Sequence, residues 1–319
     1  MSVNNTSLIL ENKNLSTFEI TENFTCIRFL NQNKERFELE FNLEKGTSFN
    51  TFLIISGDEL FIIHPPEKEY SKLINEVISN FFLQFKFKRI NIITGHVNPK
   101  IIETIKSISL KFSNLAITCS NPGSKLISEL WNQKNPKLET FIEQELPKIN
   151  IVKKELNLEL ENISLKLLPV ATARWPGGLI VYEENQEILL SEKIFSAHLV
   201  SEEWSETNRI STETDRKHFY DCLMAPMSNQ IVSIVEKISE LDIKIIAPLH
   251  GPAIEYSLKS FLNDYIRWGE NLSTNNSKIV LIYASAYGNT ASIGDALAKG
   301  VNRTSVEVES INCEFTSND

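Results

Sequence analysis

The sequence lacks several features that would assign this chain of 319 residues to a class at once. Its four cysteines, Cys26, Cys119, Cys222 and Cys313, are far apart and form no CxxC pair or Cys/His cluster, which argues against a disulfide framework. The apolar runs, such as residues 60–63, are too short to cross a bilayer, and the N-terminus has no signal-peptide pattern. We therefore expect a cytoplasmic protein with reduced thiols.

Blocks of basic residues are also missing. The chain has 41 acidic and 32 basic residues and a net charge of -9, so it is a poor candidate for binding nucleic acid or an anionic membrane. A hydrophobic content of 42% and a charged content of 23% are typical of a folded globular protein. This composition excludes global disorder, collagen-like repeats and a coiled coil.

Strand and helix patterns alternate along most of the chain, with hairpins between them. Apolar strands surround the Gly57-Asp58 turn, and helical spacing follows over residues 69–86. Further strands are predicted at 89–93, 115–118, 156–168, 179–191 and 244–248, and helices after Pro99, at 122–131, over the amphipathic segment 214–241 and at 255–270. This order predicts an α/β sandwich with mixed sheets rather than a barrel, with functional loops at the strand ends.

The last part of the chain follows a different plan. A polar, turn-rich linker is predicted at residues 271–277, and it precedes an apolar strand at 278–283. A loop then leads into a helix from Ala291, and a second strand is predicted at 306–311. This is the strand–loop–helix–strand beginning of a doubly wound domain.

The loop between that first strand and the helix has the composition of a phosphate site. Backbone amides and hydroxyl groups at a helix N-terminus suit a phosphate dianion, and glycine lets the backbone approach closely. The loop resembles the FMN-phosphate loop of flavodoxins, and an ordinary Asn/Gly turn capped by Thr290 is the alternative. The candidate FMN-binding residues are Ser285, Ala286, Tyr287, Gly288, Asn289 and Thr290.

Four motifs in the larger part carry a specific resemblance. They are Gly95–Lys100 (GHVNPK), Arg174–Gly177 (RWPG), Leu190–Phe195 (LSEKIF) and Ile246–Pro252 (IAPLHGP). Residues 45–270 resemble, in these motifs and their order, the metallo-β-lactamase-like domain of flavodiiron proteins, or A-type flavoproteins, in which a flavodoxin domain follows. The resemblance implies an αββα sandwich followed by the start of a flavodoxin-like domain.

The same resemblance places six residues at the positions that hold two irons in the family. They are His96, Asn98, Lys100, Arg174, Lys193 and His250. Three family carboxylates are replaced by Asn98, Lys100 and Lys193, and one family histidine by Arg174. Fixed cations would repel iron by several kcal/mol for each close pair, even at an effective dielectric constant of about 20. We expect no di-iron centre; a weak mononuclear site at His96 and His250 is the alternative.

The three basic replacements, Lys100, Arg174 and Lys193, need counter-charges if the fold brings them together. We expect them to converge in one pocket and to meet Glu192, Glu103 or a bound anion, so that an ion-pair cluster or an anion site replaces the metals. A solvated basic patch is the alternative. The remaining histidines, at positions 64, 198 and 218, receive no chemical role.

The resemblance also implies a function. In flavodiiron proteins, FMN of one subunit lies near the di-iron site of its partner and passes on electrons that reduce dioxygen to water, or nitric oxide. Members from phototrophs, of the cyanobacterial type, have basic or neutral residues at the iron positions and are thought to pair with an iron-bearing paralogue. The sequence looks like that subgroup, so we expect a homo- or hetero-oligomer, a redox donor and a link to photosynthetic electron transport.

Two other functions stay open. The first is a sandwich domain without catalysis that binds or scaffolds a partner. The second is hydrolysis, which is disfavoured because the metallo-β-lactamase superfamily needs H-x-H-x-D-H, and residues 96–101 read HVNPKI.

The lengths of the parts predict that the second domain is incomplete. The expected domains are 1–270, a linker at 271–277, and 278–319 as the N-terminal part of a flavodoxin-like domain. A doubly wound domain has about five strands in ~100–150 residues, more than this last part holds. We therefore expect a fragment or truncated product that binds iron and FMN poorly, with a loosely packed C-terminal part.

Overall fold

The chain folds, in a computed structural model, into two compact units, Met1–Gly269 and Glu270–Asp319. The structure describes residues 14–32, 36–37, 40–41, 43–133, 144–206, 208, 210–273, 278–304 and 306–315. Most of the predicted linker, residues 274–277, lies outside the described residues.

The larger unit contains a seven-stranded sheet in the order β1-β2-β5-β6-β7-β8-β9. Strands β1 to β6 pair antiparallel in this sheet, and the pairs from β6 to β9 are parallel. Strands β3 and β4 form a separate antiparallel pair. The bounds are β1 (Leu15–Thr21), β2 (Phe24–Asn31), β3 (Arg36–Phe37), β4 (Glu40–Phe41), β5 (Thr47–Ser56), β6 (Glu59–Ile63), β7 (Arg89–Ile93), β8 (Leu115–Ser120) and β9 (Lys148–Val152).

A five-stranded sheet in the order β10-β11-β12-β13-β14 faces the first. Its pairs are antiparallel except for the parallel pair of β13 and β14. An apolar layer that includes Phe52, Ile93, Leu165 and Val181 is buried between the sheets. The bounds are β10 (Leu156–Glu159), β11 (Ser164–Pro169), β12 (Leu179–Glu183), β13 (Ile188–Glu192) and β14 (Ile245–Pro248).

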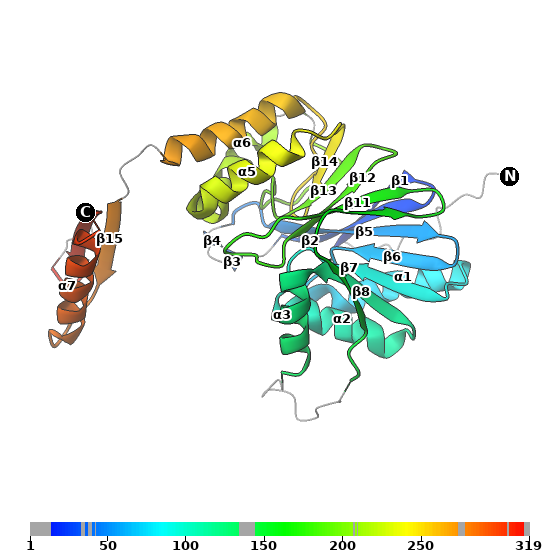
Figure 1. Cartoon of the computed structure of the whole chain (residues 1–319), viewed down its shortest axis with the longest axis horizontal. Coiled ribbons are helices and arrows are strands. Elements are labelled where there is room, and N and C mark those ends of the chain that lie inside the picture. Colours follow the sequence, from blue (N-terminus) through cyan, green and yellow to red (C-terminus); the bar gives the residue numbers. More distant parts are fainter. Residues whose placement is uncertain are drawn as a thin grey trace. The chain divides into compact units, whose positions relative to one another are not determined.

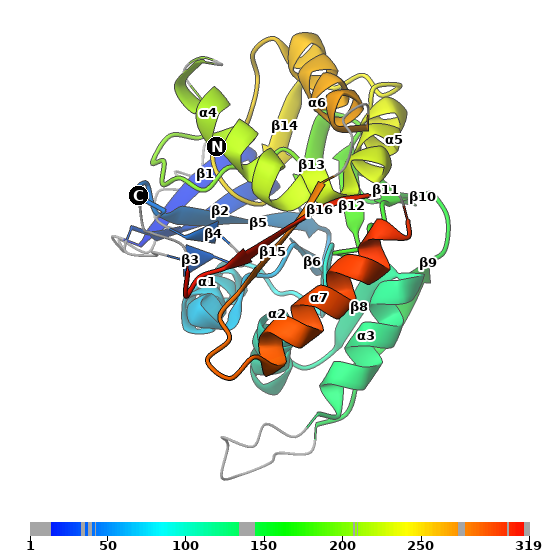
Figure 2. The ribbon, with the colours of Figure 1, turned by 90° about the vertical axis from the view of Figure 1, so that its left-hand side faces the viewer.

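Helices cover the outer faces of both sheets (Figures 1 and 2). On the seven-stranded sheet lie α1 (Ser71–Gln84), α2 (Pro99–Lys111) and α3 (Asn121–Trp131); on the five-stranded sheet lie α4 (Ile210–Phe219), α5 (Ser228–Ile238) and α6 (Leu258–Ser273). Each helical layer buries its apolar side in a core of its own. The result is the expected αββα sandwich, with mixed rather than closed sheets.

Local chemistry explains where the helices begin and where one prediction was wrong. Helix α2 begins at Pro99, and the side chain of Asn98 caps it by accepting from the amide of Ile101 at 2.9 Å. The segment 214–241 is not one amphipathic helix. A π-helical turn (Tyr220–Met224) and a 3-10 turn (Ala225–Met227) separate α4 from α5, because Pro226 lacks the N–H that a continuous helix needs.

Parallel strands bring several sequence-distant loops to one edge of the sandwich. His64 directly follows β6 and His96 lies shortly after β7, whose parallel pairing places their carboxyl ends side by side. Lys193 follows β13 and His250 follows β14 in the same way in the other sheet. The backbone amide of Asn50 donates to the carbonyl of Leu249 at 2.8 Å, which joins the two sheets at this edge. The prediction of functional loops at strand ends therefore has a structural basis.

The smaller unit consists of β15 (Lys278–Tyr283), α7 (Asn289–Asn302) and β16 (Glu307–Asn312). The two strands pair in parallel, from Lys278 opposite Glu307 to Tyr283 opposite Asn312. Large apolar side chains remain exposed here: Ile279, Val280, Ile282, Ile293 and Leu297. Among all the described residues, no helix is both long and apolar enough to span a membrane.

Candidate functional site

The centre of the candidate site is a close contact between His96 and Glu192, which come from opposite sheets. Nδ1 of His96 contacts Oε1 of Glu192, and both side chains are buried. Gly95 permits this approach, since a Cβ at its position would overlap the Cγ of Glu192 and crowd the ring of His64. Glu192 has a φ of 56°, an uncommon conformation that is found mainly at sites held by their surroundings.

The second central contact joins Lys193 and His250, which are both 1% exposed. Nδ1 of His250 lies 2.7 Å from the carbonyl oxygen of Ser48, which can only accept, so this nitrogen carries the proton. Nε2 of His250 therefore presents its lone pair, and Nζ of Lys193 donates to it at 3.2 Å. The ammonium group of Lys193 thus occupies the direction that a metal ligand bond from Nε2 would need.

Asn98 and Lys100 lie where α2 begins, at the border of the site. The amide nitrogen of Asn98 is 3.5 Å from Nε2 of His96 and donates to Oε1 of Glu67 at 3.2 Å. Nζ of Lys100 donates to Glu67 and Glu69, each at 3.0 Å. Sequence reasoning missed Glu67, although its position three residues after His64 at the end of β6 was a usable signal. The prediction that Glu103 supplies a counter-charge was wrong, because Glu103 pairs with Lys68.

The three predicted basic residues converge only in part. Lys193 is buried, whereas the side chain of Lys100 is 49% exposed and Arg174 is exposed. The guanidinium of Arg174 and the ammonium of Lys193 both lie over the ring of Trp175, at 5.4 Å and 5.8 Å from its centroid. Trp175 therefore connects two of the basic residues, while Lys100 is neutralised separately by carboxylates on the preceding loop.

Two further histidines line the site, and neither was assigned a role from the sequence. His198 is buried, with Nδ1 at 2.8 Å from the hydroxyl of Thr47, and its ring lies 4.9 Å from that of His250. His64 is buried beside Gly95, and its φ of 56° places it in the left-handed region. His64 directly follows β6, and this position was the signal available in the sequence. His218 lies elsewhere, on α4 near Cys222.

The electrostatics of the buried groups follow from burial and from their neighbours. Burial alone would raise the pKa of Glu192, but His96, Lys193 and His64 hold it below its ordinary value, so the group is a carboxylate. Burial, together with the charge of Lys193, lowers the pKa of His250 well below its ordinary value. Burial also lowers the pKa of His64 to about 4, in spite of the attraction of Glu192. Both histidines are therefore neutral near pH 7.

These residues do not fit a di-iron centre. Iron would need the Nε2 lone pairs of His96 and His250, and these face the amide of Asn98 and the ammonium of Lys193. The carboxylate of Glu192 is engaged by His96 and by the backbone amide of Lys193 at 2.7 Å. Among the described residues, no three His, Cys, Asp or Glu side chains are arranged to hold a metal ion.

The loop that the sequence predicts as a phosphate site lies at a helix N-terminus. It connects β15 to the N-terminus of α7, and Gly288 takes a φ of 81° with open space where a Cβ would lie. The hydroxyl of Ser285 accepts from the amide of Ala291 at 3.0 Å, which shapes the first turn of α7. The side chain of Tyr287 is 94% exposed. The backbone amides in the first turn of a helix have no hydrogen-bond acceptor inside the helix, and such amides commonly bind phosphate.

The sequence of the chain matches one protein family and several relatives. Residues 47–251 match the sequence model described as "ODP family beta lactamase". Diflavin flavoprotein A 6 of Nostoc sp. is 32% identical over 305 residues, which are 95% of this chain and 51% of the relative. The chain thus spans about half the length of the curated relatives that it matches.

Solved structures lead to the same family. The metal-soaked Flv1 flavodiiron core of Synechocystis sp. has a TM-score of 0.73 at 27% identity, with 95% of this chain and 73% of that chain covered. A fragment of diflavin flavoprotein A 5 of Nostoc sp. has a TM-score of 0.72 at 28% identity, with 82% of this chain and 99% of that chain covered. The resemblance to flavodiiron proteins of the cyanobacterial type is confirmed, and the chain belongs to the ODP family of β-lactamase-like domains.

Proposed function

We propose that the chain is part of a flavodiiron-type oxidoreductase subunit that takes part in FMN-dependent electron transfer toward the reduction of dioxygen to water. In this proposal it works as the partner of an iron-bearing paralogue and does not reduce dioxygen at a metal centre of its own. The relatives are named as diflavin flavoproteins and a flavodiiron core, which supports the reaction class.

The contact of Lys193 with His250 is the observation that carries the partner role. A metal ion would have to displace a buried ammonium group from the lone pair of a neutral histidine. It would also have to compete with the contact of His96 with Glu192, and Lys193 would remain as a fixed cation beside it. The energetic cost of metal binding in this pocket therefore supports a subunit that depends on a second protein for the oxygen chemistry.

The candidate FMN site contributes the redox part of the proposal. Backbone amides and hydroxyl groups at the start of α7 would hold the phosphate; they belong to Ser285, Gly288, Asn289 and Thr290. The remaining loop residues, Ala286 and Tyr287, would line the site. Bound FMN would supply one- and two-electron transfer. The chain's own residues would bind and orient the phosphate end of the cofactor.

Oxygen uptake tests the proposal directly. The chain and an iron-bearing flavodiiron relative are assayed alone and mixed, with the same flavin-reducing donor. We expect uptake at the buffer rate for this chain alone and, in the mixture, a rate above the sum of the two. Uptake by this chain alone at the rate of the iron-bearing relative would contradict the partner role. An unchanged sum together with stable co-purification would favour the alternative, a scaffold without catalysis.

A further inference from the structure

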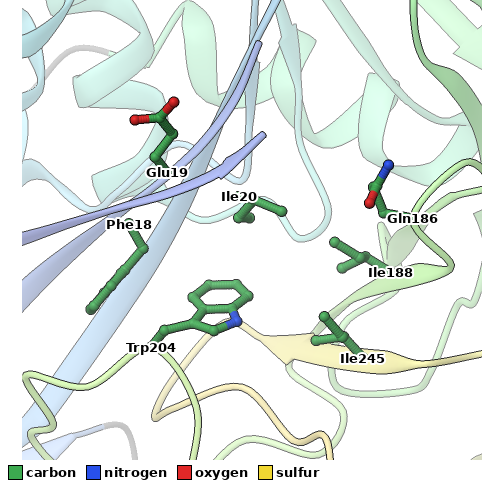
Figure 3. A pocket seen from close by; sticks show the side chains of 7 residues that line it. All are labelled: Phe18, Glu19, Ile20, Gln186, Ile188, Trp204 and Ile245. Atoms are coloured by element: carbon green, nitrogen blue, oxygen red, sulfur yellow. The ribbon is translucent and has the colours of Figure 1, made fainter. Parts of the chain in front are cut away.

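An apolar hollow opens between the edges of the two sheets, away from the loops of the candidate site. Its volume is about 420 Å³, within the range of ~300–1,000 Å³ that is typical of ligand pockets. Figure 3 shows Trp204 in the middle of one wall, with isoleucine side chains facing it. The lining residues are Phe18, Glu19, Ile20, Gln186, Ile188, Trp204 and Ile245.

A strand with an open edge borders this hollow. Phe18, Glu19 and Ile20 belong to β1, which is the first strand of the seven-stranded sheet. In the part of the chain that the structure describes, β1 pairs with β2 on one side and with no strand on the other. An unpaired strand edge presents backbone N–H and C=O groups that can pair with another extended segment.

The walls of the hollow are held in place by Arg28, which is fully buried. Its guanidinium lies over the ring of Phe18, 4.7 Å from the centroid. The same group donates to the backbone carbonyls of Ser201, Glu203 and Trp204, the last at 3.0 Å. The carbonyl of Trp204 also accepts from the amide of Ala253 at 2.9 Å. The hollow is therefore pre-organised, which lowers the entropy cost of binding.

The rim of the hollow is acidic and polar. Glu19 lies on the rim, and Figure 3 shows its carboxylate directed away from the apolar wall. A second hollow of about 180 Å³ shares Gln186 with the first and continues along the β1–β2 turn, where Glu22 and Asn23 line it. Neither lining contains Lys or Arg among the described residues. The rim thus favours a basic ligand and disfavours an anionic one.

We propose that this surface, the β1 groove, binds an extended peptide segment of another protein that carries one bulky apolar side chain with Lys or Arg on either side. The segment pairs with the open edge of β1, its apolar side chain fills the hollow against Phe18 and Trp204, and its basic residues meet Glu19 and Glu22. A second copy of the chain is the weaker occupant. Two copies joined through β1 would bring their acidic rims together, in chains that each carry a net charge of -9.

The experiment uses the full chain and two capped peptides, Lys-Val-Phe-Val-Lys and Glu-Val-Phe-Val-Glu, each with an N-terminal dansyl group. Binding is followed by anisotropy and by energy transfer from tryptophan. We expect saturable binding of the basic peptide and none of the acidic one. Glu19→Lys should weaken binding about 5-fold, as reversal of an exposed charge does, and Trp204→Ala about 10-fold or more, as loss of a central aromatic anchor does.

The matched control is Glu129→Lys, which makes the same charge change at an exposed position of α3, outside the groove. Glu129→Lys should leave the affinity for the basic peptide unchanged. Thermal unfolding of each variant checks that the variant is folded. Equal weakening by Glu129→Lys and Glu19→Lys would reduce the effect to net charge and overturn the proposal. So would binding of an uncharged dye such as Nile red that the basic peptide does not displace. Dimerisation that Glu19→Lys strengthens would instead assign the groove to a second copy.

Discussion

Removal of the buried carboxylate of Glu192 should be strongly destabilising. Glu192 is 3% exposed and lies against His96 and the positive charge of Lys193. Glu192→Gln keeps the shape of the side chain and its acceptor for the amide of Lys193, but removes the counter-charge. Removing one partner of a buried charged pair lowers the free energy of unfolding by ~3–5 kcal/mol. Because Gln keeps the hydrogen bond from the amide of Lys193, we expect a loss near the lower end, about 3 kcal/mol. Typical domains are stable by only ~5–15 kcal/mol, so the loss is large.

Urea unfolding followed by tryptophan fluorescence measures this loss, since all four tryptophans (Trp131, Trp175, Trp204, Trp268) lie in the larger unit. The pKa of Glu192 is lowered in the folded chain, so its contribution is present above the ordinary carboxyl pKa. That contribution disappears as the pH falls through the lowered pKa. The difference between wild type and Glu192→Gln should therefore be full at pH 7 and shrink below about pH 4.

Glu183 provides the matched control for this substitution. It is also fully buried, but its oxygens accept from the backbone amides of Asn185 and Gln186 at 3.0 Å and 2.7 Å, and burial raises its pKa. Glu183→Gln should cost about 1 kcal/mol, as expected for hydrogen bonds to backbone amides. Equal losses of stability in both variants would contradict this reasoning, and so would a loss in Glu192→Gln that is the same at pH 7 and at about pH 3.

Two further predictions concern the same edge of the sandwich. Burial lowers the pKa of His64 to about 4. Between about pH 6.5 and pH 4 the histidine is therefore protonated in the unfolded chain and neutral in the folded chain. The free energy of unfolding falls as the pH is lowered through this range. His64→Asn, which tolerates the φ of 56°, should make this pH dependence shallower by ~1.4 kcal/mol per pH unit in urea titrations, and an unchanged slope would contradict it. Asn98→Ala should cost about 1 kcal/mol in thermal unfolding because it removes the cap of α2, and Asn98→Ser, which keeps an uncharged capping oxygen, should recover most of this loss.

The fold could be predicted from the sequence where local signals act alone. The Gly57-Asp58 turn between two apolar segments correctly predicted the hairpin of β5 and β6. Pro99 correctly predicted the beginning of α2. The helical segment from 214 onward was predicted as continuous because its apolar spacing outweighed Pro226, whose backbone constraint is decisive in the structure. Strand β9 was not predicted, since its pattern along the chain is weak and its pairing with β8 stabilises it.

The site was predictable in its residue types but not in its contacts. Strand ends and family motifs identified His96, Lys193 and His250, and the charge argument pointed to Glu192 as a counter-charge. Which cation each carboxylate meets depends on how the two sheets face each other. For that reason Glu67 rather than Glu103 neutralises Lys100, and Glu192 contacts His96 across the sandwich.

Measuring the iron content of the purified chain would show whether Lys193, Asn98 and the contact of His96 with Glu192 take the places that a di-iron centre would need. The chain is produced and purified in iron-supplemented medium beside an iron-bearing flavodiiron relative, and metals are measured by inductively coupled plasma mass spectrometry. The account predicts ~0 iron per chain, because the histidine lone pairs are already engaged, against about two per chain in the relative. About two irons per chain in this protein would contradict the account.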